Sequence, residues 1–313
     1  MGTDVKPMDA QDWGLLVFLS ILWGATFFWA GVAVQELPPL SVVLIRVGGA
    51  AIVLLPLLFW AGHSLPRGFA GWVPFLGMGL FNNVLPFGFI FAGQTQIGVG
   101  LSAIINSMTP LFTVLVMAGF SEERLTRFRL IGVLLGVAGV VVLNGGGAAL
   151  QGGQLLGVAL CMAGASSYGF AALWARRKLA GVPPLKSATC QLICSTAILL
   201  PVVALVDRPW SLTVPSDGVL WALVALALLG TALAYLVFFR ILTRAGPSNV
   251  MLVTLLIPVT AILLGWAILH EAVTPRDLLG AGVIGFGLLF IDGRIPARLH
   301  RAVTGTGRAK TRN

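Results

Sequence analysis

The residues that could bind a solute are uncharged polar and aromatic side chains inside long apolar stretches of the chain. They are Trp23, Asn82, Asn83, Asn106, Ser167, Tyr168, Thr231, Tyr235 and Thr254. Polar groups are costly in hydrocarbon, and they tend to line interior surfaces or transport pathways there. Hydroxyl, amide and indole groups form hydrogen bonds without carrying a charge, so this set suits the reversible binding of a small polar molecule.

Residues for catalysis or metal binding are not grouped. His63, His270 and His300 lie far apart with no acidic pair beside them, and the three cysteines lie in apolar segments. An alternative function, that of a membrane-embedded lipid-modifying transferase, needs clustered Asp, His or Cys residues. We therefore expect no enzyme activity, no cofactor and no metal site.

Acidic residues avoid the middle of the apolar segments. All eleven lie in connections, tails or segment ends. Proton-driven exporters of cations usually bury a carboxylate that carries the proton, so the sequence favours facilitated diffusion or exchange. His270 with Glu271, and Glu122 with Glu123, lie at segment ends, where we expect a capping or gating role.

Arg46 is the one charged residue well inside an apolar segment. It lies about 9 Å along a helix from the start of its segment, so its side chain could snorkel to the outer interface. It could instead bond carbonyl groups of a neighbouring helix or attract a substrate carboxylate. A structural role is favoured here, and the alternatives stay open.

The elements that position these residues follow from the composition. Of 313 residues, 58 % are hydrophobic and 10 % are charged, and the mean hydropathy is +0.96. A soluble protein has about 25 % charged residues, so the sequence predicts an all-α integral membrane protein. Its ten expected transmembrane helices cover residues 13–33, 40–61, 72–92, 99–119, 128–144, 154–175, 185–206, 218–239, 248–269 and 278–292.

The chain repeats itself. A shift of 145 residues places Leu37-Pro38-Pro39-Leu40 on Val182-Pro183-Pro184-Leu185, and a shift of 148 aligns residues 98–144 with 246–292 without a gap. The second alignment matches Pro110 with Pro258, Glu123 with Glu271, Gly132 with Gly280 and Gly139 with Gly287. Each half holds five segments, an odd number, so we expect two inverted five-helix repeats over residues 13–144 and 154–292, followed by a basic tail over 293–313. Many secondary transporters have this architecture.

The repeat also relates the polar residues. It pairs Asn83 with Thr231 and Asn106 with Thr254, which predicts a central cavity at the membrane midplane between the repeats. Ser and Thr could instead bond their own helix backbone. Adjacent residues point about 100° apart on a helix, so Asn82 and Asn83 are not expected to share one neighbour.

Prolines within the segments are candidate hinges for alternating access, because proline removes a backbone hydrogen bond. The candidates are Pro86, Pro110 and Pro258. A static kink is the alternative.

Basic residues set the expected orientation. With the N-terminus in the cytoplasm, 17 of the 20 Lys and Arg residues fall on the cytoplasmic side, as the positive-inside rule requires. We expect a multi-pass protein of the cell (inner) membrane with both termini cytoplasmic. The expected partners are a small-molecule substrate and the lipid bilayer, which the basic tail would contact, with no nucleic acid and with a monomer as the functional unit.

Four stretches together are typical of one known family. They are Leu22-Trp23-Gly24-Ala25-Thr26-Phe27, Leu37-Pro38-Pro39-Leu40 through Arg46, Thr231-Ala232-Leu233-Ala234-Tyr235, and Pro258 through Glu271 to Leu278-Leu279-Gly280. With the duplication, they resemble the drug/metabolite transporter superfamily in its ten-helix form with two EamA domains. Within that superfamily the chain is most similar to bacterial amino-acid exporters, including the aromatic amino-acid type. The resemblance implies export of small metabolites, with amino acids favoured.

Overall fold

The computed structural model describes residues 8–122, 125–143, 153–250 and 252–291. The expected basic tail over residues 293–313 lies outside these described residues. Every regular element in the described part of the chain is helical, as the sequence predicts.

The α-helices follow the ten expected segments, four of which are interrupted. They are α1 (Ala10–Ala33), α2 (Pro39–Trp60), α3 (Gly68–Gly79), α4 (Leu85–Gln94), α5 (Val99–Asn106), α6 (Thr109–Gly119), α7 (Arg127–Leu143), α8 (Gly153–Lys178), α9 (Pro184–Val206), α10 (Asp217–Ala227), α11 (Ala234–Ala245), α12 (Pro247–Val250), α13 (Val253–Leu269) and α14 (Pro275–Ile291). Seven of the resulting spans are long and apolar enough to cross a membrane. The remaining three, α7, α13 and α14, have 17 residues each.

Two of the interruptions are π-helical turns at equivalent places in the two halves. η1 (Leu80–Val84) joins α3 to α4, and η4 (Leu228–Leu233) joins α10 to α11. Their first residues are 148 positions apart, which is the shift that the sequence repeat gives. The N–H group of Leu85 donates to the carbonyl group of Leu80, five residues back, and Pro86 has no N–H group to donate to Phe81. The first π-turn therefore leaves the Phe81 carbonyl group available to another helix.

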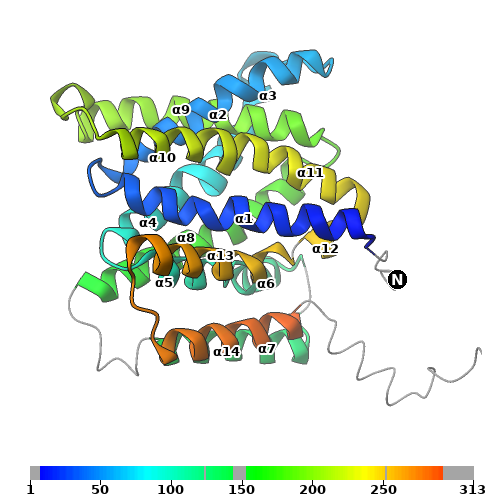
Figure 1. Ribbon diagram of the computed structural model, residues 1–313. Coiled ribbons are helices and arrows are strands. Elements are labelled where there is room, and N and C mark those ends of the chain that lie inside the picture. The colour runs from blue at the N-terminus through cyan, green and yellow to red at the C-terminus, as the bar shows by residue number, and fades with distance from the viewer. Residues whose placement is uncertain (1–7, 123–124, 144–152, 251, 292–313) are drawn as a thin grey trace, which may run out of the picture.

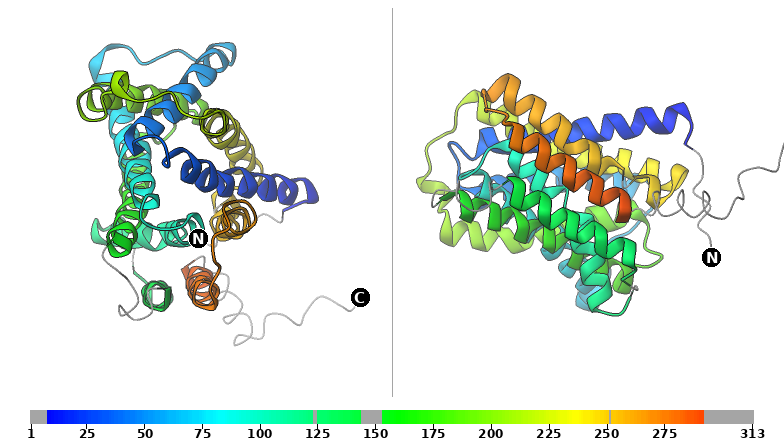
Figure 2. Two further views of the ribbon diagram at one scale, coloured as in Figure 1. Left: turned by 60° about the vertical axis from the view of Figure 1, so that its left-hand side comes forward. Right: turned by 90° about the horizontal axis from the view of Figure 1, so that it is seen from below.

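The two halves interlock. The closest helix packings join α2 to α9, α4 to α8, α1 to α13, and α7 to α14, each time one helix from each half. Figures 1 and 2 show α7 and α14 side by side at one edge of the bundle, with the other helices arranged together above them. The interface between the two halves therefore extends through the whole bundle.

Glycines allow the close approach of α7 and α14. A Cβ atom on Gly132 would lie 2.6 Å from the carbonyl oxygen of Gly287, and one on Gly139 would lie 3.0 Å from that of Gly280. The repeat matches Gly132 with Gly280 and Gly139 with Gly287, so exchanging the halves exchanges the two contacts. This crossing has the symmetry expected of an inverted repeat.

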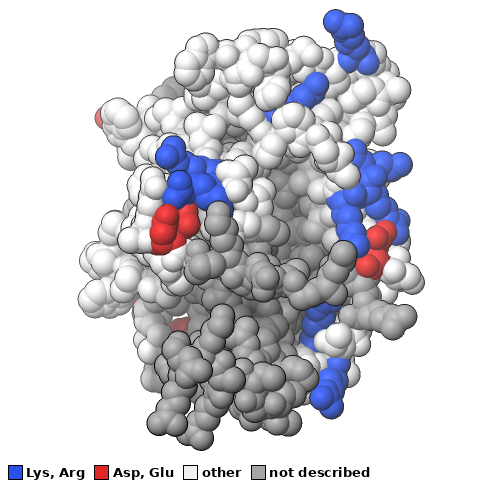
Figure 3. Space-filling model, turned by 90° about the vertical axis from the view of Figure 1, so that its right-hand side faces the viewer, with Lys and Arg blue, Asp and Glu red and all other residues white. Residues whose placement is uncertain are grey.

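The two ends of the bundle differ in charge. Described basic residues gather at the end where α1 begins and α8 and α11 end, as Figure 3 shows. There Arg244 pairs with Asp9 and Asp12, and Arg177 pairs with Glu122. At the opposite end, carboxylates from connections accept hydrogen bonds from helix N-termini: Glu271 from the N–H groups of Val99 and Gly100, at 2.7 and 3.1 Å, and Asp207 from that of Ser41, at 2.9 Å. Glu271 is thus a cap, as expected for a residue at a segment end.

Candidate substrate-binding site

Polar side chains from both halves meet where the π-turns pass α2 and α9. We call this set the polar cluster, and its members are Arg46, Asn82, Asn83, Gln191, Ser195, Thr231 and Tyr235. Asn83 and Ser195 are fully buried, whereas Asn82 and Tyr235 are only half-buried although both contact other helices. The cluster therefore combines fixed polar groups with groups that a small molecule can reach.

The two asparagines connect η1 to the second half. Nδ2 of Asn82 donates to Oε1 of Gln191 at 3.1 Å and to the hydroxyl group of Tyr235 at 3.5 Å. Nδ2 of Asn83 donates to Oγ of Ser195 at 3.0 Å, and the Tyr235 hydroxyl group lies 3.3 Å from Oδ1 of Asn83. The expectation that the asparagines would not share a neighbour is wrong. Gln191 and Ser195 are one turn apart on α9, and the Tyr235 hydroxyl group contacts the side-chain amides of both Asn82 and Asn83.

Arg46 points into the bundle. The residue is 5 % exposed, its Nε donates to Oγ1 of Thr231 at 2.9 Å, and its guanidinium carbon lies 3.8 Å from the ring centre of Phe87. Thr231, in the second π-turn, in turn donates to the carbonyl group of Leu226, five residues back in the last turn of α10. Snorkelling to the interface is therefore excluded, and the partner of Arg46 is a hydroxyl group instead of the carbonyl groups that the sequence suggested.

The α8 residues divide between two roles. Oγ of Ser167 donates to the carbonyl group of Phe81 at 2.8 Å, which is the group that the first π-turn leaves available. Ser166 bonds the carbonyl group of Met162 in its own helix, so the packing alternative holds for it. Tyr168 is half-buried and lies within electrostatic range of both Arg46 and Tyr235.

An aromatic row leads from α1 to the polar cluster. The ring of Trp23 lies 5.4 Å from that of Phe238, Phe238 lies 5.4 Å from Phe239, and Phe239 lies 6.1 Å from Tyr235. Trp23 is half-buried. These rings can hold an apolar group next to the polar cluster.

Asn106 and Thr254 lie at the other two interruptions. Asn106 is the last residue of α5, and its Oδ1 atom is buried without a hydrogen-bond partner among the described residues. Thr254 is the second residue of α13 and is half-buried. Sequence reasoning placed both in the midplane band. The hydrogen bonds that join the described members of the polar cluster do not involve Asn106.

The predicted hinge prolines have different settings. Pro86 directly follows the first residue of α4 after the π-turn, and Pro110 is the second residue of α6 after the interruption at Ser107 and Met108. Pro258 lies inside the continuous helix α13. Pro86 and Pro110 therefore lie beside interruptions of the α-helix, whereas Pro258 removes one hydrogen bond within a helix that continues on both sides of it.

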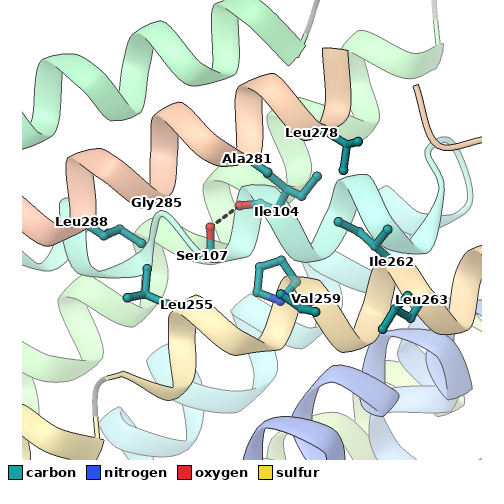
Figure 4. A pocket seen from close by; sticks show the side chains of 11 residues that line it. Ile104, Ser107, Leu255, Val259, Ile262, Leu263, Leu278, Ala281, Gly285 and Leu288 are labelled. Carbon is teal, nitrogen blue, oxygen red and sulfur yellow. Dashed lines mark hydrogen bonds between the residues drawn. The ribbon is translucent and has the colours of Figure 1, made fainter. Parts of the chain in front are cut away.

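Two cavities lie away from the polar cluster. One of about 310 Å³ lies between α5, α13 and α14, where Figure 4 shows Ile104, Leu255, Val259 and Leu278 facing it. The other, of about 600 Å³, lies at the bundle end near Gln96 and Asp277. The first cavity is lined almost wholly by apolar side chains. The hydroxyl group of Ser107, which also lines it, donates to the Ile104 carbonyl group.

Sequence reasoning missed two members of the polar cluster, Gln191 and Ser195. The shift of 145 residues makes Gln191 the neutral counterpart of Arg46. A usable signal existed, because the two residues lie four positions apart on one face of an apolar helix. In the described part of the chain, no group of three His, Cys, Asp or Glu residues could hold a metal ion.

Comparisons with known proteins come from sequence and from structure. The profile of the EamA-like transporter family matches residues 13–145 and 155–292. YedA, an uncharacterized inner membrane transporter of Escherichia coli, is 27 % identical over 282 residues, which are 89 % of each protein. The protein PecM of Dickeya dadantii is 28 % identical over 277 residues, which are 87 % of this chain and 89 % of PecM. A solved crystal structure of a 24 % identical protein shares the fold with a TM-score of 0.64, over 91 % of this chain and 97 % of that one.

Proposed function

Because this chain belongs to the EamA-like transporter family and is a membrane transporter rather than an enzyme, we propose that it exports small metabolites from the cytoplasm across the inner membrane. Amino acids are the substrate class that we favour. The polar cluster is the proposed binding site, reached from each side of the membrane in turn, and one chain is the functional unit.

One observation carries this proposal: each interhelical hydrogen bond of the polar cluster joins the first half of the chain to the second. Arg46 bonds Thr231, Asn82 bonds Gln191 and Tyr235, and Asn83 bonds Ser195. A solute that replaces some of these bonds would contact both halves at once. Small movements of one half against the other would then change access to the solute, as alternating access requires.

The chemistry of the cluster supports a zwitterionic or neutral solute. Amide and hydroxyl groups can donate and accept hydrogen bonds to an amino acid, and the aromatic row beside them can hold its side chain. The π-turns and the break before α6 would supply the bending, with Pro86 and Pro110 as proposed hinges and Pro258 as a weaker candidate.

The orientation is part of the proposal. Lys and Arg are retained on the cytoplasmic side of membrane proteins, and the described basic residues gather at the end of the bundle where α1 begins. We therefore place that end, with both termini, in the cytoplasm. The end that Glu271 and Asp207 hold together is then the outer one.

Transport by purified protein in liposomes tests the site. We expect labelled L-phenylalanine to exchange across the membrane with the wild type and at least about tenfold more slowly with an Asn83→Leu, Tyr235→Phe double variant, because that variant loses hydrogen bonds between the halves. Ser166→Ala is the matched control, since Ser166 lies in the same band but bonds its own helix. Equal flux in the double variant and the wild type would reject the polar cluster as the site.

A further inference from the structure

Arg46 carries a positive charge that no protein carboxylate balances in the described part of the chain. The residue is 5 % exposed. Each described acidic residue lies in a connection or within three residues of a helix end, where Asp207 bonds Ser41 and Glu271 bonds the start of α5. A buried charge is costly unless it is paired and hydrogen-bonded. The ring of Phe87 offsets part of this cost by a cation–π contact, but it supplies no negative charge.

The guanidinium group also has unused donors. Its Nε bonds Thr231, and no described residue accepts a hydrogen bond from Nη1 or Nη2. Phe87 lies 3.8 Å from the guanidinium carbon and covers one face of the plane. A ligand therefore approaches the Nη1–Nη2 edge within the plane, where two parallel N–H groups match the two oxygens of a carboxylate.

We propose that Arg46 is the carboxylate-binding residue of the transport site, so that the transported class is metabolites with a carboxylate group. This inference rests on the proposed function and narrows it. The ligand supplies the missing negative charge, while Tyr235, which bonds Asn82 and Asn83 in the same cluster, offers a hydroxyl group at the site. The repeat gives the neutral Gln191 as the counterpart of Arg46, so the site offers one cation and takes one carboxylate.

Competition with matched probes tests the charge requirement in the wild type. Exchange of labelled L-phenylalanine in liposomes is measured against 3-phenylpropionate and its neutral amide, 3-phenylpropanamide, which have nearly the same size and shape. We expect the acid to compete at concentrations about 10- to 100-fold lower than the amide, as the loss of a charge-assisted bidentate contact implies. Equal competition by acid and amide overturns the proposal.

Variants assign the effect to Arg46. Arg46→Gln should abolish the preference for acid over amide, and Arg46→Lys should keep part of it, because lysine retains the charge without the planar fork. Thr231→Val is the matched control: it removes the Nε hydrogen bond but leaves the cation, so the preference should remain. A merely structural role for Arg46 would lower flux without changing the ratio between the two probes, and that result would reject the proposal.

A binding measurement separates this inference from the proposed function. Titration calorimetry of the detergent-solubilised wild type with 3-phenylpropionate and 3-phenylpropanamide reports the preference without transport. If no probe is transported but the acid alone binds, the amino-acid export proposal fails and the carboxylate site stands. If L-phenylalanine is transported and the two probes bind equally, export stands and the carboxylate site fails. Where Arg46→Gln does not fold, these wild-type comparisons still decide.

Discussion

Removing the Glu271 carboxylate should loosen one end of the bundle by a predictable amount. This side chain extends from the connection between α13 and α14. It accepts hydrogen bonds of 2.7 and 3.1 Å from the N–H groups of Val99 and Gly100, the first two residues of α5. It therefore joins the second half to the first at the proposed outer end. Gly98 and Gly265 leave room for it, because a Cβ atom on either would lie 2.9 or 2.7 Å from a carboxylate oxygen.

The magnitude follows from the two hydrogen bonds and the helix terminus. Loss of an N-terminal cap costs about 0.5–2 kcal/mol, and loss of a negative charge at a helix N-terminus costs about 0.3–1 kcal/mol. Since these two contributions add and Glu271 is half-buried, we expect Glu271→Ala to cost about 1–3 kcal/mol in all. That corresponds to a fall in the apparent Tm of about 2–8 °C. Glu271→Gln keeps an acceptor oxygen and should lose about half as much.

The same free energy should favour opening of this end by about 5- to 150-fold. Cys161 offers a native reporter, because it is fully buried and its Sγ atom lies 3.4 Å from Oγ of Ser102 on α5. In a background with Cys190 and Cys194 replaced by alanine, we expect Glu271→Ala to raise the rate of Cys161 labelling by a membrane-impermeant maleimide.

The control for this experiment is Asp277→Ala. Asp277 lies in the first turn of α14, accepts hydrogen bonds from Thr274 just before that helix, and does not join the halves. Tm should therefore fall by less, and Cys161 labelling should not change. An unchanged Tm together with unchanged labelling in Glu271→Ala would refute the reasoning that this carboxylate holds the end closed.

Two further predictions concern the helix crossing and pH. Gly132→Val should destabilise the protein by about 1–3 kcal/mol, because the new side chain meets the carbonyl oxygen of Gly287. Gly282→Val is the control and should not destabilise it, because a Cβ atom at Gly282 meets open space. Thermal unfolding in detergent compares the two variants. Hydrogen bonds from the hydroxyl and N–H groups of Ser216 lower the pKa of Glu36 below its ordinary value of 4.5. A carboxylate whose pKa is lowered by folding stabilises the folded state at pH values above its ordinary pKa. This stabilisation is lost as the pH falls through the pKa of the folded state. The Tm advantage of the wild type over Glu36→Gln should therefore shrink between about pH 5 and pH 3, and a constant difference would contradict this assignment.

The helices and their duplication could be read from the sequence for a simple reason. A membrane span needs about 20 apolar residues, and its backbone can only be helical, so a run such as residues 40–61 predicts α2 (Pro39–Trp60) closely. Proline, glycine and glutamate matches at one constant shift, such as Pro110 with Pro258, expose the repeat. These signals are local or periodic and do not depend on which helices touch.

The site needed the contacts between distant segments. The sequence singled out Asn82, Asn83, Thr231 and Tyr235 as polar residues in hydrocarbon, but not that Gln191 and Ser195 would complete the cluster. Arg46 shows the reason most clearly. Its place in the chain is compatible with snorkelling outward or pointing inward, and rotation about its long side chain decides between them.

The sequence by itself therefore determined a ten-helix membrane protein with an inverted repeat and a band of uncharged polar residues. Only the tertiary structure decided which of those residues meet, because the packing of α2 against α9 and the two π-turns set the direction of each side chain. Arg46 lies 185 residues from its partner Thr231. A contact of that kind depends on how the two halves interlock, which no local pattern of residues encodes.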